Sequence, residues 1–312
     1  MGDSAIDARA PRVTCLGALV VDLTFWAPRR PQPGETLLGT RFEEFLGGKG
    51  FNQAVAAARL GADVAMIGAV GTDHYGERFL AALARERITA CVQRVAEGTG
   101  IGSPLVTEDG EVSILGIPRA NAALSADVVE AMSHALEDID ILVVQCEVPL
   151  AASVRAAQLA KERGARVMVN PAPAGPEALA LVAYADLLIL NAVEARMIGT
   201  PPELKAPQAA SHLADRFGCP VVITLGSDGA VVAAGGAVDR VAAHEVESVD
   251  PTGAGDAFCA AFSVELARGA DPRAALAFAN AAGACAVTVA GAEPSMPSRA
   301  AVAALLADVA LR

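Results

Sequence analysis

The stretch DPTGAGD at residues 250–256 leads directly into an apolar helical run at residues 257–266. Gly253 and Gly255 permit positive φ, so successive N–H groups can form a small concavity where a helix begins and negative charge is favoured. The pattern is not a dinucleotide-binding turn, because Phe258 stands where a third glycine is needed. The stretch therefore predicts an anion site at a helix N-terminus.

Asp256, the last residue of this stretch, has two interpretations. A carboxylate at the start of a helix is commonly a cap that accepts hydrogen bonds from backbone amides. Alternatively, it accepts the proton of an attacking hydroxyl while the glycine turn stabilises a phosphoryl group in transfer. The residue type and its position favour neither interpretation over the other.

Short β-branched runs alternate with Ala- and Leu-rich helical runs along the rest of the chain. The predicted strands are 13–20, 64–70, 141–145, 166–170, 187–190 and 221–225, and the predicted helices include 52–60, 76–85 and 151–163. This alternation is typical of a parallel α/β sheet, which binds ligands beyond the carboxyl ends of its strands. The Ala-rich run 276–292 is predicted to be a buried helix that continues into a strand.

Residues 36–46 and 100–117 interrupt this alternation, since they have the pattern of strands without intervening helices. Asp109-Gly110 predicts a hairpin turn within the second segment. The two segments either form a small accessory sheet, as a lid or an interface, or provide edge strands of the main sheet. No repeat or linker divides the chain, so one domain over residues 1–312 is predicted.

The charge and cysteine content limit the partners and the compartment. With 24 basic and 36 acidic residues the net charge is -12, which argues against nucleic acid and membrane surfaces as partners but not against a small phosphate ligand. Six scattered cysteines without a C-x-x-C pair, and no apolar run in residues 1–11, predict a cytoplasmic protein with reduced thiols. The four histidines lack the spacing of a zinc site.

A second glycine cluster, GGKGFNQ at residues 47–53, precedes a helical run that ends at Leu60. Its glycines allow the backbone to approach a ligand closely, although an ordinary loop can have the same composition. It is not a Walker A loop, because Glu43 and Gly50 occupy positions that require Gly and Ser or Thr. Lys49 and Asn52 either bind hydroxyl groups or are solvated loop residues.

Two further candidates follow predicted strands. Asn191 and Glu194 place an amide and a carboxylate on one side of a helical segment, as ligand contacts or as an ordinary helix start. The stretch TLGSDG at residues 224–229 predicts either a tight turn against a nucleotide or a simple hairpin.

In combination, GGKGFN, Asn191-x-x-Glu194 and DPTGAGD resemble the ribokinase family, the phosphofructokinase-B-type carbohydrate kinases, in order and approximate spacing over residues 13–297. The resemblance implies a three-layer α/β/α fold with a mostly parallel central sheet. It also implies a small β-sheet lid, formed by segments of about 22–46 and 100–119, which often serves as a homodimer interface. The implied reaction is ATP-dependent phosphorylation of a primary hydroxyl, with magnesium and a monovalent cation, usually potassium.

The resemblance also implies roles for the residues that match the family motifs. Asp256 matches the catalytic base, and Gly253, Ala254 and Gly255 match the backbone anion hole. The matching sugar contacts are Asp22, Gly48, Lys49, Asn52, Glu147 and Asp256. The matching nucleotide contacts are Asn191, Thr224, Gly226, Gly229 and Asn280. Glu194 matches an indirect magnesium position, and the monovalent-cation positions are Asp250, Thr252, Ala286, Val289, Gly291 and Ser295.

Three residues depart from the family pattern and bear on the acceptor, for which D-ribose, giving D-ribose 5-phosphate, is the first expectation. Val20 replaces the usual Asn, Arg119 stands where many members have Gly, and Trp26 lies close to Asp22. A nucleoside needs an apolar wall, for which Trp26 and Val20 are candidates. An acidic sugar such as 2-keto-3-deoxygluconate needs an arginine, for which Arg119 is the candidate. Fructose remains a further alternative, and so does a non-catalytic sugar- or nucleotide-binding regulator, against which the presence of Asp256 argues.

Overall fold

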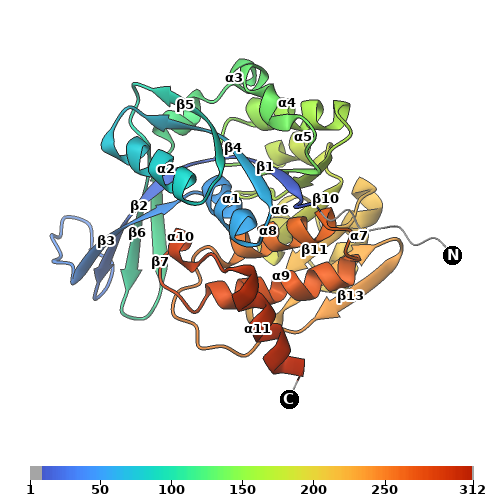
Figure 1. Cartoon of the computed structure of the whole chain (residues 1–312). Coiled ribbons are helices and arrows are strands. Elements are labelled where there is room, and N and C mark those ends of the chain that lie inside the picture. The colour runs from blue at the N-terminus through green and yellow to red at the C-terminus, as the bar shows by residue number, and fades with distance from the viewer. Residues whose placement is uncertain (1–8, 311–312) are drawn as a thin grey trace.

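In the computed structural model, which describes residues 9–310, nine strands form one sheet at the centre of the molecule (Figure 1). Residues 1–8 and 311–312 of the predicted domain lie outside the described residues. The strand order is β13 (Ala237–Val241), β12 (Ala230–Ala234), β11 (Val221–Thr224), β10 (Leu187–Asn191), β9 (Arg166–Val169), β8 (Ile141–Val144), β1 (Arg12–Leu16), β4 (Asp63–Gly71) and β5 (Thr89–Val95). The strands from β11 to β5 are parallel, and β12 and β13 continue the sheet antiparallel.

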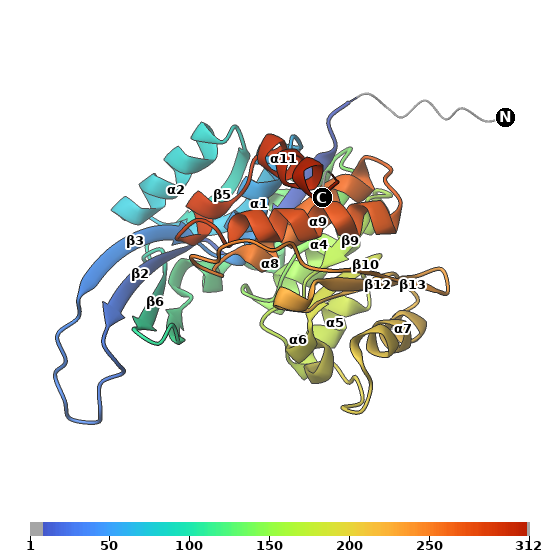
Figure 2. The same ribbon diagram turned by 90° about the horizontal axis from the view of Figure 1, so that it is seen from below.

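Helices cover both faces of this sheet (Figure 2). One face packs against α1 (Lys49–Arg59), α2 (His74–Arg85), α8 (Ala254–Ala267), α9 (Pro272–Ala286) and α11 (Arg299–Ala310). The other packs against α3 (Ala126–Ala131), α4 (Leu150–Glu162), α5 (Leu179–Val182), α6 (Ala192–Met197) and α7 (Ala206–Phe217). Successive residues of β8 alternate between the two cores, since Val143 contacts the first and Val144 the second. The predicted three-layer α/β/α fold is confirmed.

A second, four-stranded sheet projects from one end of the molecule (Figures 1 and 2). Its order is β3 (Arg41–Gly47), β2 (Val20–Ala27), β6 (Gly100–Thr107) and β7 (Val112–Ile117), with only the β2–β6 pair parallel. Asp109 and Gly110 connect β6 to β7, so the predicted hairpin is confirmed. The irregular segments therefore form a separate sheet and not edge strands of the main one, although the first strand begins only at Arg41.

The predicted continuous strand 13–20 is wrong, because the chain leaves the central sheet after Leu16 and enters the second sheet at Val20. A Cβ at Gly17 would lie 2.1 Å from Gln145 Oε1, so the backbone passes too closely here for any side chain. Asn121 holds the segment between β1 and β2. Its side chain accepts from the Leu19 N–H at 3.0 Å and donates to the Leu19 carbonyl at 2.8 Å. This crossing carries the following residues to the second sheet.

The strand predicted at the end of run 276–292 is also wrong. Helix α9 ends at Ala286, and a turn follows it, with Gly291 at a φ of 83° before the short helix α10 (Ala292–Ser295). The Val287 carbonyl accepts hydrogen bonds from the N–H groups of Val249 and Asp250, so this β-branched segment fixes the loop before α8 and pairs with no strand of the described chain. Four 3₁₀ turns complete the elements: η1 (Arg119–Ala123), η2 (Ser133–Leu136), η3 (Pro176–Ala178) and η4 (Gly226–Asp228).

Within residues 9–310, no helix is both long and apolar enough to span a lipid bilayer.

Candidate active site

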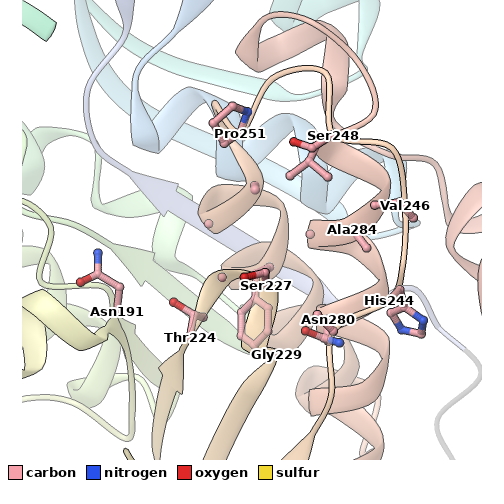
Figure 3. Close-up of a pocket in the computed structure, with 17 residues that line it drawn as sticks. Asn191, Thr224, Ser227, Gly229, His244, Val246, Ser248, Pro251, Asn280 and Ala284 are labelled. Atoms are coloured by element: carbon pink, nitrogen blue, oxygen red, sulfur yellow. The ribbon is translucent and has the colours of Figure 1, made fainter. Parts of the chain in front are cut away.

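The glycine turn before α8 separates two cavities at the carboxyl ends of the central strands. Ala254 and Gly255 line the first cavity, of about 520 Å³, which Figure 3 shows. Gly253 and Asp256 line the second, of about 480 Å³, which lies under the second sheet. Because neighbouring residues of one turn face both cavities, a group bound in one cavity lies next to a molecule bound in the other.

The backbone of this turn has the geometry of an anion site. Gly253 precedes the helix with a φ of 82°, which only glycine adopts readily. Among the residues that the structure describes, the N–H groups of Gly253, Gly255 and Asp256 donate to no protein acceptor. Of the three predicted anion-hole residues, Ala254 differs, because its N–H donates to the Pro251 carbonyl at 3.3 Å. Free amides at the start of a helix of 14 residues provide both hydrogen bonds and the positive end of the helix dipole for an anion.

Asp256 does not cap its own helix. Its Oδ2 accepts from Asn52 Nδ2 and its Oδ1 from Gln53 Nε2, each at 2.9 Å, and the residue is 7% exposed. Helix α8 begins at Gly253 without any capping side chain. The helix-cap interpretation is therefore wrong, and the carboxylate lies in the wall of the second cavity, where a bound hydroxyl can reach it.

The structure brings all six predicted sugar-contact residues to the lining of the second cavity: Asp22, Gly48, Lys49, Asn52, Glu147 and Asp256. They come from four parts of the chain, namely β2, the start of α1, the loop after β8 and the first turn of α8. The Lys49 backbone N–H donates to Glu147 Oε2 at 2.8 Å, which fixes that carboxylate at the cavity floor. The cavity therefore combines carboxylates, an ammonium and an amide, the groups that bind hydroxyls.

The charges of this cavity are strongly coupled. Burial, together with Glu147 and Asp256, raises the pKa of Asp22 to about 7. Burial also raises the pKa of Glu147, against the opposing effect of Lys49. For Lys49, burial lowers the pKa, but the attraction of Asp256, Glu147 and Glu194 outweighs it and holds the pKa above the ordinary value. Three carboxyl groups around one ammonium suit a neutral, hydroxyl-rich molecule and disfavour an anionic one.

Two of the residues that depart from the family pattern lie outside this lining. Arg119 donates from Nη1 to the Thr99 carbonyl at 3.1 Å and packs over Gly98, and the Trp26 ring stacks under the guanidinium of Arg41 at 4.4 Å. Val20 does line the cavity, together with Ile101, Ile114 and Ile117 of the second sheet. The structure therefore supplies neither an arginine for an acidic sugar at position 119 nor an aromatic wall at position 26.

The first cavity contains all five predicted nucleotide contacts: Asn191, Thr224, Gly226, Gly229 and Asn280. Figure 3 shows Asn191 and Thr224 on one side and Asn280 on the other. The TLGSDG stretch forms the β11–β12 hairpin, which confirms that interpretation, and it also lines the cavity, so the predicted turn against a nucleotide stays a prediction that this position allows. Asn280 Nδ2 donates to the Ala242 carbonyl at 2.7 Å. This hydrogen bond holds the segment after β13, whose residue His244 lines the cavity.

Asn191 and Glu194 form a capping box at the start of α6. Asn191 Oδ1 accepts from the N–H groups of Val193 and Glu194, and Glu194 Oε2 accepts from the Asn191 N–H at 2.8 Å. Burial raises the pKa of Glu194, and its hydrogen bond from Asn191 opposes that change. Within the described residues no cluster of three His, Cys, Asp or Glu could hold a metal ion. Mg²⁺ is commonly bound through one or two carboxylates, with waters and substrate phosphates as its other ligands, and Glu194 could supply one such carboxylate.

The predicted monovalent-cation positions lie at one corner beside the glycine turn. Asp250 joins the two segments involved, since it accepts from the Thr252 N–H at 2.9 Å and from the Gly291 N–H at 2.8 Å. Ser295 is buried in α10 and donates to the Ala292 carbonyl. Ala286 ends α9 and Val289 lies in the turn that follows, where the Ala286 carbonyl already accepts from the Val289 N–H. Carboxylate, hydroxyl and carbonyl oxygens of this kind fit a hard cation.

Several residues of the site were missed from the sequence. Gln53, Gln145 and Asn170 form a buried amide cluster behind Asp256, and Ser227 and Phe258 line the first cavity. The only available signal was a polar side chain within an apolar run, because buried polar groups need partners. That signal does not identify the partner.

A parallel α/β/α fold with two adjoining cavities, and free helix amides between them, is typical of an enzyme that binds two small molecules side by side. The chain belongs to the pfkB family of carbohydrate kinases, whose family model matches residues 10–299. It is 36% identical to the ribokinase of Bacillus subtilis over 94% of this chain and 99% of the relative.

Solved structures agree with this assignment. The ribokinase of Thermotoga maritima superimposes with a TM-score of 0.86 at 29% identity, covering 96% of this chain and all of that chain. The ribokinase of Arabidopsis thaliana, in complex with ribose and ATP, superimposes with a TM-score of 0.84 at 29% identity, covering 96% and 99%. The protein is thus a kinase, an ATP-dependent phosphotransferase.

Proposed function

We propose that this kinase phosphorylates D-ribose at its primary hydroxyl, with ATP as donor, to give D-ribose 5-phosphate. The observation that carries the proposal is the position of Asp256 in the carboxylate-rich second cavity, next to free amides of the glycine turn that separates it from the first cavity. The relatives named as ribokinases, and the one solved with ribose and ATP, support ribose as the acceptor.

The proposed reaction uses both cavities at once. Asp22, Lys49 and Glu147 bind the sugar hydroxyls in the second cavity, so that the primary hydroxyl lies against Asp256. Asp256 takes the proton as the hydroxyl oxygen forms a bond to the γ-phosphorus, and the bond to the β-phosphate oxygen breaks to release ADP. The N–H groups of Gly255 and Asp256 stabilise the charge on the phosphoryl oxygens.

Two ions are part of the proposal. Glu194 and Asn191 would lie beside magnesium bound with the ATP phosphates, and the ion would supply charge that neutralises them. The oxygens at the Asp250 corner would hold potassium, which would supply positive charge beside the anion hole. The Asp250 carboxylate accepts a hydrogen bond from the Thr252 N–H, and this bond orders the backbone just before the glycine turn.

We further propose that the second sheet is a lid and that two copies of the chain associate through it. Large apolar side chains are exposed on its strands, among them Phe25, Phe42 and Leu115. Exposed apolar side chains that gather on one sheet are typical of an interaction surface. All six cysteines carry free thiols, which supports a cytoplasmic location.

The alternative acceptors are less well supported by the site. The three carboxyl groups of the second cavity repel an acidic sugar, and Arg119 is bonded elsewhere. Of the two candidates for the apolar wall that a nucleoside base needs, Trp26 does not line the cavity, and Val20 does, so this alternative depends on aliphatic side chains alone. Fructose is compatible with the same groups. A non-catalytic regulator would not need the buried hydrogen bonds to Asp256.

The test is ADP release, with magnesium and potassium present, across ribose, deoxyribose, fructose, 2-keto-3-deoxygluconate, adenosine and other nucleosides. We expect ribose to be preferred, and Asp256→Asn to lower kcat by about 10²- to 10⁴-fold because the proton acceptor is lost. Ser263→Ala, a buried change in the same helix that loses one hydrogen bond to a backbone carbonyl, is the control and should keep kcat. ADP release that no acceptor stimulates, or a fully active Asp256→Asn, would contradict the proposal.

A further inference from the structure

A chain of buried side-chain amides runs from the central sheet to Asp256. Gln145 Nε2 donates to Gln53 Oε1 at 2.6 Å, and Gln53 Nε2 donates to Asp256 Oδ1 at 2.9 Å. Asn170 lies beside the chain, with its Oδ1 at 3.5 Å from Gln53 Nε2, and its Nδ2 donates to the Ile189 carbonyl at 2.9 Å. Gln53 and Gln145 have no exposed surface.

The neighbouring hydrogen bonds fix the orientation of the Gln53 carboxamide. Its oxygen is engaged by Gln145, so its nitrogen must face Asp256, and a rotated amide would set two acceptors against each other. Asn170 directly follows β9, and its Nδ2 is held by the Ile189 carbonyl of β10, so its Oδ1 faces the Gln53 nitrogen. Gln145 directly follows β8, and its Oε1 has no hydrogen-bond partner among the described residues. The central sheet therefore acts on the Gln53 orientation through Asn170.

Gln53 differs from its neighbour Asn52 in what it can touch. Asn52 lines the second cavity and is therefore a candidate contact for the sugar, whereas Gln53 lines neither of the two cavities beside the glycine turn. Any effect of Gln53 on the reaction must then pass through Asp256. Each carboxylate oxygen accepts one amide hydrogen and keeps lone-pair capacity for the proton of a hydroxyl.

We propose that Gln53 is a positioning residue for phosphoryl transfer. Its amide holds the Asp256 carboxylate in one side-chain rotamer and in the ionised form that accepts a hydrogen bond. This inference rests on the proposed role of Asp256 as base. The donated amide hydrogen stabilises the ionised carboxylate, and the second amide from Asn52 keeps its plane fixed. Small displacements of a reacting group of this kind reduce the rate steeply.

The experiment replaces Gln53 by Met, which is similar in volume but cannot donate a hydrogen bond. We expect Gln53→Met to lower kcat by about 10- to 100-fold and to leave the KM for the sugar within about twofold, because no sugar contact is lost. Gln158→Met is the matched control. Gln158 lies on α4 and lines neither cavity, and its amide donates to the Tyr184 hydroxyl at 2.9 Å. Its replacement should change neither parameter.

The same change in an Asp256→Asn background separates positioning from a general structural effect. If Gln53 acts through the carboxylate, adding Gln53→Met to Asp256→Asn lowers the residual rate by less than about twofold. An equal loss in both backgrounds, a parallel rise in KM, or an unchanged kcat in the single variant would overturn the inference. If Gln53→Met does not fold, Gln145→Met takes its place, because it removes the hydrogen bond to the Gln53 oxygen. We then expect a lower kcat at constant KM, and an unchanged kcat would overturn the inference.

The two proposals fail in different ways. If the wild type shows no sugar-stimulated ADP release, or Asp256→Asn is fully active, the proposed function or its base is wrong, and the role inferred for Gln53 is overturned with it. If the wild type is active, Asp256→Asn is not, and Gln53→Met equals the wild type, only the role of Gln53 is refuted.

Discussion

Asp22 illustrates how burial changes the chemistry of a single residue. Its carboxyl lies between the backbones of two glycines, because a Cβ on Gly47 or Gly102 would come within 2.6 or 2.2 Å of its oxygens. No side chain could replace either glycine without displacing it. Burial there, and the nearby charges of Glu147 and Asp256, raise its pKa to about 7, so its charge changes near neutral pH.

We expect the affinity for the sugar to depend on this ionisation. An ionised Asp22 accepts two or more hydroxyl hydrogens, whereas the protonated form accepts fewer, so the KM for the sugar should fall by up to about tenfold between pH 6 and pH 8. Asp22→Asn cannot ionise and should give a higher KM with a flatter pH dependence. Steady-state kinetics over this range is the measurement, and a wild-type KM independent of pH would contradict the prediction.

The same group also links stability to pH. The pKa of Asp22 is about 7 in the folded protein and 3.8 in its ordinary state, so the folded protein binds more protons between these values. Its contribution to stability is therefore complete below about pH 4 and is lost as the pH rises through 7. We expect the free energy of unfolding of Asp22→Asn to increase relative to that of the wild type between pH 5.5 and pH 8. Urea unfolding at both pH values measures this difference, and a difference that does not change with pH would contradict the prediction.

At the level of elements, short helices are specified by their caps. The six-residue helix α6 begins with Asn191 in a capping box, and α3, also six residues long, begins with Ser125, whose side chain accepts from the Val128 N–H. Both helices are too short to be stable alone, so the cap and the packing against the sheet hold them. Only α6 contributes its cap residue to the first cavity.

This pair gives a matched test of the nucleotide site. Asn191→Ala and Ser125→Ala should each lower the free energy of unfolding by about 0.5–2 kcal/mol, because each removes a cap. Only Asn191→Ala should also raise the KM for ATP, by about 2- to 10-fold, through loss of a polar contact. Denaturant unfolding and ATP kinetics measure both effects, and an equal KM for the two variants would show that Asn191 is only a cap.

For the whole molecule, the main question is what covers the second sheet. Leu115 on β7 is 71% exposed, and Phe25 and Phe42 form an exposed ring pair with centroids 5.0 Å apart. The central sheet has fewer such residues, with Val238 on its edge strand β13 at 42% exposure. The apolar surface is thus concentrated on the part of the molecule that lies over the sugar cavity.

We expect the wild type to sediment as a dimer at micromolar concentration. A symmetric interface contains each residue twice, so Leu115→Glu buries two charges and should raise the dissociation constant by about tenfold or more. Val238→Glu adds the same charge at the edge of the central sheet and should leave the dimer intact. Sedimentation velocity over a concentration series distinguishes these outcomes, and a monomeric wild type would refute association through the lid.

The elements that the sequence predicted correctly are those with local signals. The alternation of β-branched and Ala-rich runs identified the parallel sheet, and Asp109-Gly110 identified the hairpin of the second sheet. The errors arose where a distant contact overrides local preference. Gly17 breaks a continuous apolar run because Gln145 and Gly50 approach it, and the β-branched run after Ala286 becomes a turn because Val249 and Asp250 bond to it.

By itself, the sequence determined the glycine turns and the alternation of a parallel α/β sheet, since these depend on backbone freedom and on local preference. The three-layer fold and the roles of Asp256, Lys49 and Glu147 followed from the resemblance to the family. Only the tertiary structure decided that Asp256 is held by Asn52 and Gln53, which lie more than 200 positions away, and that Arg119 and Trp26 lie outside the cavity. The physical reason is that burial and hydrogen-bond partners arise between segments that meet only when the chain is packed.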